Sequence, residues 1–230
     1  MSSTAKKIII YAYRLTDDTG CAPCIFDRDG NPTGTLSLAC CKGGQIRNEG
    51  KHNEREIRTG LRHAIGSEHK QQIANGQVTV YVLGIYKDTL LYFAEITEII
   101  TMTDYFAPGS PYKNRLDNIY DTLPKGFNRN DNNPAFHPKA DTGRHKRDWL
   151  GVYALLSNIF AYFGRDSKAI PPNLLRFLPK GQETKHYDGD SSEGKQILDE
   201  VRKHWNFKDV IQGTPHDYNG GCGHKGCGTK

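Results

Sequence analysis

The chain has 230 residues and carries 31 lysines and arginines against 26 aspartates and glutamates, which gives a formal net charge of +5 at pH 7. Charged residues make up 25% of the chain and hydrophobic residues 36%, with 24 glycines and 11 prolines, so collagen, coiled coils and wholesale disorder are excluded. The apolar stretches fall far short of the roughly 18 consecutive residues that a membrane span needs, so we expect no membrane partner. The N-terminal residues do not form an apolar signal region, which predicts a protein of the reducing cytoplasm.

The first elements are predicted from patterns of apolar and turn-forming residues. Alternating β-branched and aromatic residues predict a strand over residues 6–15 that is covered on both faces. Turn-forming residues then predict a long loop over 16–34, followed by a short strand over 35–40. Apolar residues at helical spacing predict an amphipathic helix over 53–65 that Gly66 ends.

The middle of the chain alternates between regular and irregular patterns. In chain order we expect a short helix over 67–74, two strands joined by a turn over 78–85 and 90–100, and one helical turn over 101–106. Residues 108–146 have almost no apolar periodicity and are expected to be a mobile insert or an ordered loop that builds a site. Residues 149–163 regain the apolar character of a strand or strand pair.

The last predicted element is a helix behind a serine cap. Its residues 192–205 carry an apolar stripe, through which Leu198, Val201 and Trp205 are expected to pack against the sheet. Residues 219–230 contain five glycines and are expected to be flexible unless a metal orders them.

Strands without a regular alternation of helices predict an α+β fold rather than a doubly wound sheet. We expect a small, curved, mainly antiparallel sheet or a partly closed barrel, with peripheral helices. Residues 1–218 are expected to form a single domain, in which residues 48–76 are a charged helical insertion and residues 108–147 are a long loop region. Residues 219–230 would then form a separate tail rich in glycine and cysteine.

Two groups of cysteines at opposite ends of the chain could bind zinc. Cys21 and Cys24 lie three residues apart near one end, and Cys222, His224 and Cys227 lie near the other. Four thiolates and an imidazole suffice for a tetrahedral zinc site, which would also give the tail a reason to dock. The alternative is that these cysteines are reduced and bind no metal, and no other cofactor is indicated.

A short glycine-containing segment is suited to an anion. Cys41 and Arg47 have the spacing found in phosphatase loops, where backbone amides and a guanidinium surround phosphate beside a thiolate. Gly43 and Gly44 let the backbone approach a ligand closely, and Lys42 and Arg47 supply positive charge. Because this spacing also arises easily by chance, we favour phosphate binding over phosphate cleavage.

Two further groups of polar residues are candidates for function. Basic residues concentrate where few acidic ones oppose them, and they could follow a nucleic-acid backbone: Lys139, Arg144, Lys146 and Arg147. A net charge of this size is also normal for a solvated surface.

Histidines in polar, loop-like sequence could act as general bases if each is paired with a carboxylate. Most such residues are only solvated. The candidate histidines are His137, His145, His186 and His216, and the candidate partners are Asp117, Asp141, Asp148 and Asp188.

Short motifs follow one another in a fixed order along most of the chain. They are Tyr13-Arg14, Asp18-Thr19-Gly20-Cys21-Ala22-Pro23, and residues 36–42, 46–47, 82–84, 91–98, 117–120, 160–164 and 185–186. No single motif is specific, but their order resembles that of the nucleotide modification associated domain 2 family. The chain departs from the family pattern in residues 48–76 and in the tail, which we do not match.

This resemblance implies the kind of system in which the protein works and does not by itself imply an activity. Members are associated with bacterial and phage systems that modify nucleic-acid bases, so the chain is expected to work with other components of such a system, in the host cytoplasm if it is encoded by a phage. More weakly, the order of loop, strand and hairpin is similar to that of PUA-like barrels, including the ASCH and EVE groups. Those domains bind RNA or flip a modified base into an aromatic pocket, and this remains an analogy at the level of the fold.

Two functional hypotheses follow, and binding is the favoured one. The first is a module that binds a modified nucleotide, or a modified base in nucleic acid, through Asp18, Gly20, Ala22, Pro23, Lys42, Arg47, Asn118, Tyr120 and Tyr162. The alternative is an enzyme that modifies a nucleobase or nucleotide, with Asp117 or His186 as general acid or base and Cys41 as nucleophile. Binding is favoured because the sequence shows no complete set of nucleophile, base and orienting group. A structural or interaction protein is the third possibility.

Overall fold

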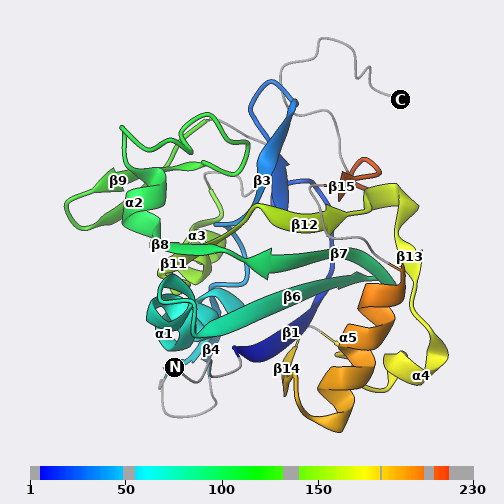
Figure 1. Ribbon diagram of the computed structural model, residues 1–230. Coiled ribbons are helices and arrows are strands. Elements are labelled where there is room, and N and C mark those ends of the chain that lie inside the picture. The colour runs from blue at the N-terminus through cyan, green and yellow to red at the C-terminus, as the bar shows by residue number, and fades with distance from the viewer. Residues whose placement is uncertain (1–5, 49–54, 132–139, 182, 205–209, 218–230) are drawn as a thin grey trace.

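The structure is a computed structural model that describes residues 6–48, 55–131, 140–181, 183–204 and 210–217 (Figure 1). Within these residues, seven strands form the largest sheet: β1 (Lys7–Leu15), β6 (Val78–Tyr86), β7 (Thr89–Ile96), β12 (Ile159–Tyr162), β13 (Lys168–Ala169), β14 (Thr184–Asp188) and β15 (Val210–Ile211). Their order is β14-β1-β6-β7-β12-β15, and β13 pairs with β7. The pairs β1–β6 and β12–β15 are parallel, and the other pairs are antiparallel.

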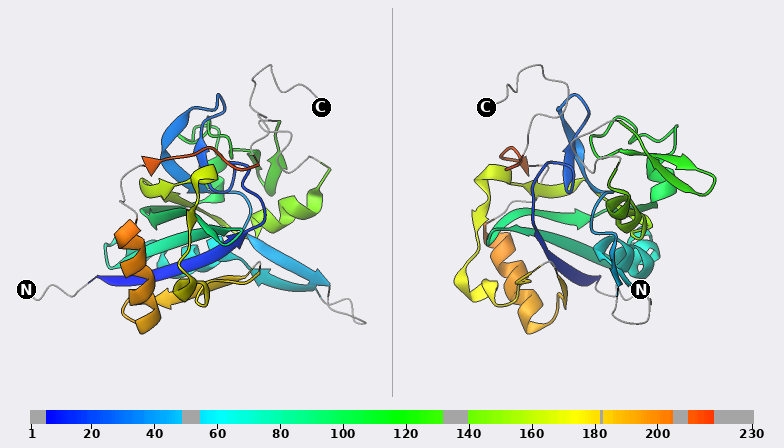
Figure 2. Two further views of the ribbon diagram at one scale, coloured as in Figure 1. Left: turned by 90° about the vertical axis from the view of Figure 1, so that its right-hand side faces the viewer. Right: turned by 180° about the vertical axis from the view of Figure 1, so that it is seen from behind.

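A second sheet of four strands has the order β2-β3-β11-β8 among the described residues. Its strands are β2 (Cys24–Phe26), β3 (Pro32–Leu38), β8 (Glu98–Thr101) and β11 (Tyr153–Ser157). Two hairpins complete the strands, formed by β4 (Gly44–Asn48) with β5 (Arg55–Thr59) and by β9 (Tyr120–Leu123) with β10 (Gly126–Arg129). The β4–β5 hairpin projects from the body of the molecule (Figure 2, left).

Helices cover the outside of the sheets. They are α1 (Leu61–Ala74), α2 (Met102–Phe106), α3 (Thr142–Trp149), α4 (Pro172–Leu175), α5 (Ser192–His204) and the single 3-10 turn η1 (Gly164–Asp166). No helix among the described residues is both long enough and apolar enough to cross a membrane. The expected α+β class, with mostly antiparallel sheets and peripheral helices, is confirmed.

The strand β1 divides its side chains between two hydrophobic cores. Ile9, Tyr11 and Tyr13 belong to the core between the two sheets, whereas Ile10 and Ala12 belong to the core on the opposite face. This alternation follows from the two-residue period of a strand. The prediction of a strand over residues 6–15 that is covered on both faces is therefore confirmed.

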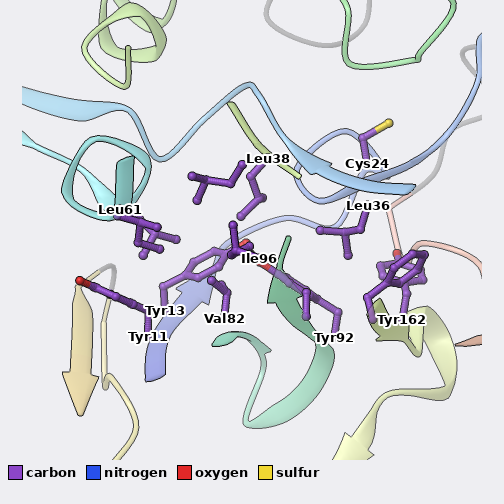
Figure 3. Close-up of a cluster of buried hydrophobic side chains, with 14 of the residues drawn as sticks. Tyr11, Tyr13, Cys24, Leu36, Leu38, Leu61, Val82, Tyr92, Ile96 and Tyr162 are labelled. Carbon is purple, nitrogen blue, oxygen red and sulfur yellow. The ribbon is translucent and has the colours of Figure 1, made fainter. Parts of the chain in front are cut away.

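The core between the sheets is rich in tyrosine. Tyr13 and Tyr92 of the large sheet face Leu36 and Leu38 of β3 (Figure 3). The hydroxyl of Tyr92 donates to that of Tyr13 at 2.8 Å, which satisfies polar atoms that water cannot reach.

The core on the opposite face is closed by α5 and α4 (Figures 1 and 2). Ile197, Leu198 and Val201 of α5 are buried there with Phe93 of β7. The predicted apolar stripe of this helix is thus confirmed for Leu198 and Val201, while Trp205 lies outside the described residues.

The helix predicted over residues 53–65 is wrong. Residues 55–59 instead form the strand β5, and the helix α1 begins only after Gly60 and continues through Gly66 to Ala74. Pairing of β5 with β4 supplies backbone hydrogen bonds that local apolar spacing cannot reveal. Gly66 therefore lies inside the helix and does not end it. Only glycine fits there, because the ring of Tyr153 occupies the space that a Cβ atom would need.

Two other expectations also need correction. The loop predicted over residues 16–34 contains β2 and the start of β3, which pair with each other although turn-forming residues surround them. Residues 108–147 likewise contain the hairpin β9–β10 and most of α3. Of the two expected forms, sheet or partly closed barrel, the described strands form open sheets, and β14 and β15 are the two ends of the large one.

Candidate functional site

The parallel strands β1 and β6 end side by side, with Leu15 paired to Tyr86. The loop after β1 carries Asp18, and the segment after β15 brings His216 and Asp217 to the same place. Polar groups from three distant parts of the chain therefore meet at this end of the β1–β6 pair. This end of the pair is a candidate site for that reason.

Asp18 is almost completely buried and receives three donors. The hydroxyl of Tyr162 donates to Oδ1 at 2.8 Å, and the backbone amide of His216 donates to Oδ2 at 2.9 Å. The ring Nδ1 of His216 lies 3.1 Å from the same Oδ2. Burial and the neighbouring carboxylate raise the pKa of Tyr162 well above its ordinary value, so this hydroxyl stays protonated and donates.

The segment that carries His216 is fixed from several sides. Asp217 Oδ2 accepts hydrogen bonds from the amide of Asp18 at 2.9 Å and from the hydroxyl of Tyr86 at 3.1 Å. The rings of Tyr86 and His216 lie 4.6 Å apart, and the guanidinium of Arg165 donates to the His216 carbonyl at 3.4 Å. The histidine side chain is nevertheless 23% exposed, so it is held firmly and still meets solvent.

A strained turn lies at the entry to the β4–β5 hairpin. Cys41 and Lys42 have φ values of 57° and 50°, a left-handed conformation that costs a non-glycine residue about 1–3 kcal/mol. A Cβ atom on the next residue, Gly43, would lie 2.3 Å from the carbonyl oxygen of Arg147, so only glycine fits there. We call residues 41–43 the clamped turn, because the surrounding structure fixes its conformation.

Arg62 and Asp148 hold the clamped turn. The fully buried guanidinium of Arg62 donates to three backbone carbonyls, those of Cys41 at 2.6 Å and of Tyr153 and Asp148 at 2.5 Å. The carboxylate of Asp148 accepts hydrogen bonds from the Cys41 amide at 2.8 Å and from the Tyr120 hydroxyl at 2.7 Å. The anion bound by the Cys41 amide is thus the chain's own Asp148. Residues 44–48 form a strand and do not curl around a phosphate.

Lys42 has a different setting from the rest of the clamped turn. Its Nζ donates to the Arg14 carbonyl at 3.0 Å and lies 4.8 Å from the centre of the Tyr13 ring. Burial lowers the pKa of Lys42 from its ordinary value. Among the described residues no carboxylate lies within ion-pair distance of this partly buried ammonium, and the negative charge of Asp17 opposes the lowering of its pKa only in part. The side chain of Arg47, expected to act with Lys42, lies outside the described residues.

The helix α3 adds positive charge next to the clamped turn. Its inward side chains, His145 and Asp148, are buried, whereas Arg144, Lys146 and Arg147 are exposed. Arg144 is paired with Asp141 at 2.8 Å. Because Gly43 packs directly against the carbonyls of residues 147 and 148, the exposed cations of α3 lie beside the clamped turn. Lys139 and His137 lie outside the described residues.

Asp117 lies in a buried network of its own. Ser37 donates to its Oδ2 at 2.6 Å, Tyr105 donates to its Oδ1 at 2.5 Å, and the guanidinium of Arg115 lies 3.7 Å from Oδ1. Arg115 also donates to the carbonyl of Cys24 at 2.6 Å. Asp117 is completely buried, and this network joins β2 and β3 to the chain before β9.

The three residues of the enzyme hypothesis occupy three separate settings. Asp117 bonds to Ser37 and Tyr105, and the Cys41 amide bonds to Asp148. His186 lies on the edge strand β14, where its ring is 5.7 Å from that of Tyr11. None of the hydrogen bonds described for Asp117 or His186 joins them to one another or to Cys41.

Most of the other predicted ligand-binding residues contribute to the core. Tyr162 is fully buried, so its ring faces are covered rather than open to a base. Gly20 is buried with a φ of 81°, and a cis peptide bond joins the partly buried Ala22 to the buried Pro23. Asn118 is buried and donates to the carbonyl of Tyr105 at 3.0 Å.

The zinc hypothesis rests on residues that the structure describes only in part. Cys21 and Cys24 are buried, whereas Cys222, His224 and Cys227 lie outside the described residues. Burial raises the pKa of Cys24 to about 12, and its thiol donates to the carbonyl of Phe26. Zinc binds thiolates, so this setting favours a protonated structural cysteine. Among the described residues, no three His, Cys, Asp or Glu side chains are grouped to hold a metal.

Sequence reasoning did not single out the pairs that the structure forms. His216 and Asp148 appeared only in a broad set of polar residues, and nothing linked His216 to Asp18, which is 198 residues away. Arg62 lies in the segment predicted as an amphipathic helix, where a charged residue is expected to be exposed, yet the structure buries it fully. No short motif signals these contacts, because each joins segments that are far apart in the sequence.

Comparison with known proteins gives one match. The sequence model of a family described as nucleotide modification associated domain 2 matches residues 7–221, which is nearly the whole chain. No curated protein and no solved structure matches the chain.

Proposed function

The chain belongs to the nucleotide modification associated domain 2 family, and from this premise we propose that it binds a nucleotide, free or within nucleic acid, as part of a system that modifies nucleic-acid bases. The observation that carries this proposal is the ammonium of Lys42, which is partly buried and has no carboxylate within ion-pair distance among the described residues. We expect the phosphate of the nucleotide to lie against it.

A phosphate would complete the coordination of Lys42. An ammonium has three N–H donors, and the described contacts are one carbonyl oxygen and one aromatic face. Removing a charge from water is costly unless an opposite charge or hydrogen bonds compensate, and burial of Lys42 lowers its pKa for this reason. A phosphate oxygen offers both the charge and an acceptor, which favours the charged ammonium.

The neighbouring helix supports a ligand with more than one phosphate. Lys146 and Arg147 of α3 are exposed beside the clamped turn, and Arg144 precedes them on the same helix. Such cations bind backbone phosphates without reading the sequence. Specificity for a modified base, and the cooperation with other components of the system, are part of the proposal and rest on the family alone.

The original enzyme hypothesis receives less support than binding. A general acid or base must reach the reacting proton, and Asp117 is completely buried with its oxygens bonded to Ser37 and Tyr105. His186 has no carboxylate partner among the described residues, and the contact recorded for its ring is with Tyr11.

The test compares Lys42→Ala with Lys70→Ala. Lys70 is an exposed lysine of α1 whose ammonium also lies over a tyrosine ring, at 5.8 Å, so it is a matched control. Calorimetry would measure binding of nucleoside triphosphates, and fluorescence polarisation would measure binding of single-stranded DNA and RNA. Loss of one charged hydrogen bond is worth about 1.5–3 kcal/mol, so we expect Lys42→Ala to weaken binding roughly tenfold to a hundredfold. The Lys70 variant should bind like the parent.

The salt dependence gives a second readout. If Lys42 contacts a phosphate of an oligonucleotide, the slope of log affinity against log salt should fall by about 1 in Lys42→Ala. Equal affinity and an equal salt slope in the two lysine variants would contradict the proposal. Binding of free nucleotides without binding of oligonucleotides would restrict the ligand to the free form.

A further inference from the structure

The imidazole of His216 differs from the other described histidines in its hydrogen bonds. Its Nδ1 faces the buried carboxylate of Asp18 at 3.1 Å, and its Nε2 has no hydrogen-bond partner among the described residues. In His69, by contrast, both ring nitrogens are occupied, Nε2 by the Tyr11 hydroxyl and Nδ1 by Gln72, each at 3.0 Å. His216 thus combines an orienting carboxylate with a second ring nitrogen that has no described partner.

The surroundings fix the tautomer of His216. An ionised carboxylate only accepts hydrogen bonds, and the Asp18 oxygens already face the Tyr162 hydroxyl and the backbone amide of His216. In the neutral imidazole, the proton between Asp18 and the ring therefore lies on Nδ1, which leaves the lone pair on Nε2. This is the arrangement of a general base that a second group orients.

We propose that His216 and Asp18 form a proton-transfer site that acts on the nucleotide phosphates bound at Lys42. This inference rests on the proposed function and deepens it. Lys42 bonds to the carbonyl of Arg14, near the end of β1, and Asp18 follows that strand directly, so the two groups belong to the same end of the sheet. The substrate class is a nucleoside triphosphate, and the reacting atom is phosphorus.

The step conserves atoms and charge. The lone pair of His216 Nε2 takes a proton from a water molecule while the water oxygen forms a bond to phosphorus. The imidazolium that results is stabilised by the carboxylate of Asp18. As the bridging P–O bond breaks, the imidazolium returns the proton to the leaving phosphate oxygen, so the histidine ends neutral. His216 is the catalytic residue, and Asp18 is a positioning residue that acts through it.

Several other titratable or charged groups face this site. They come from the elements packed around it and are Tyr86 from β6, Lys87 from the following turn, Tyr162 from β12, Arg165 from η1 and Asp217 from the C-terminal segment. Of these, Asp217 is bonded to Tyr86 and Asp18, and Tyr162 donates to Asp18. They fix the pair in position, and Nε2 of His216 remains the group without a described partner.

The experiment measures both binding and turnover with the full chain. Each common ribonucleoside and deoxyribonucleoside triphosphate is incubated with the protein in a buffer that contains magnesium, and products are measured by mass spectrometry. General-base catalysis contributes roughly a hundredfold to ten-thousandfold, so His216→Ala should lower kcat by at least about a hundredfold. His63→Ala, on α1, is the control and should keep parental turnover. Added imidazole should restore part of the turnover of His216→Ala, which a merely structural role would not allow.

The Asp18 variant tests the positioning role. Asp18→Asn can still accept the proton of Tyr162, so it is the mildest change at this carboxylate. We expect kcat to fall while KM changes little, because the imidazole loses the group that fixes its tautomer.

The outcomes separate the two proposals. No binding of any nucleotide by the parent would overturn the proposed function, and this inference with it. Two results would overturn only the proposal of a proton-transfer site. One is binding that depends on Lys42 without turnover of any nucleotide, and the other is turnover that persists in His216→Ala. The same holds if imidazole fails to restore activity to a folded His216→Ala variant.

Discussion

At the scale of single residues, Arg62 shows how a buried charged side chain can fix the conformation of the backbone by hydrogen bonds. Its guanidinium has no exposed surface and donates to the carbonyls of Cys41, Asp148 and Tyr153. Burial lowers the pKa of Arg62, opposed by the negative charge of Asp148, but the group keeps its planar set of donors. The left-handed conformation of Cys41 and Lys42 therefore depends on a side chain from a different element.

Replacing Arg62 with methionine should destabilise the protein strongly. Methionine fills similar space but leaves three buried carbonyls without donors and the charge of Asp148 without its partner, which typically costs about 3–5 kcal/mol. Urea unfolding of Arg62→Met measures this loss. Arg176→Met, at an exposed position of the chain, should stay within about 0.5 kcal/mol of the parent. Similar unfolding free energies for the two variants would show that Arg62 does not hold the clamped turn.

At the scale of elements, α1 is a helix stabilised by packing rather than by its own sequence. It has no side-chain hydrogen bond at its N-cap Gly60, no acidic residue in its first turn and no basic residue in its last turn. Isolated helices of this length are marginal, so its stability must come from tertiary contacts. Leu61, Ile65 and Gly66 provide them against the core and Tyr153.

Gly66 of α1 and Gly143 of α3 should respond to alanine in opposite directions. A Cβ at Gly66 would lie 2.1 Å from the ring of Tyr153, whereas a Cβ at Gly143 meets nothing closer than Asp141 at 3.8 Å. Alanine is usually better than glycine inside a helix by about 1 kcal/mol. We expect Gly143→Ala to stabilise the protein by up to this amount and Gly66→Ala to destabilise it by about 1–3 kcal/mol, as overpacking does. Thermal and urea unfolding of both variants decide the point, and stabilisation by Gly66→Ala would refute the packing argument.

At the scale of the whole molecule, many tyrosine hydroxyls and cysteine thiols, which lose a proton in alkaline solution, are buried in the cores. Burial raises the pKa of Tyr11 to about 12 and that of Cys24 to about 12, from ordinary values of 10.0 and 9.0. It raises the pKa values of Tyr92 and Tyr105 well above the ordinary value as well. All these groups stay protonated in the folded protein under conditions in which an unfolded chain would lose its protons.

The protein should therefore lose stability in alkaline solution. Each raised pKa contributes stability that is fully present below the unfolded value and is lost as the pH rises toward the folded value, by about 1.4 kcal/mol per pH unit and group. For Cys24 and Tyr11 this window lies between pH 9 and about 12. Urea unfolding measured across the window should give a falling free energy, and Cys24→Ser should fall less steeply because serine stays neutral. A free energy that does not change with pH would contradict this account.

The local sequence pattern alone predicted the strands and helices in which apolar residues recur at the spacing of that element. The alternation in residues 6–15 predicted β1 and its two covered faces, and the helical spacing in residues 192–205 predicted α5, because each pattern reflects the burial of one element. The order of short motifs also pointed to the family that the sequence model confirms. These signals lie within a few residues of one another or in their order along the chain, so they are readable without coordinates.

Only the tertiary structure decided which residues meet. Asp18 and His216 are 198 residues apart, and the amide of Cys41 finds its anion in Asp148, 107 residues away. Residues 55–59 form a strand because β4 pairs with them, against their own helical spacing. Such contacts arise from the packing of distant segments, and the energy of a buried charge or an open imidazole nitrogen depends on all its neighbours at once. For that reason the sequence shows which chemical groups are present, and only the fold shows that Asp18 meets His216 and that Lys42 meets the carbonyl of Arg14.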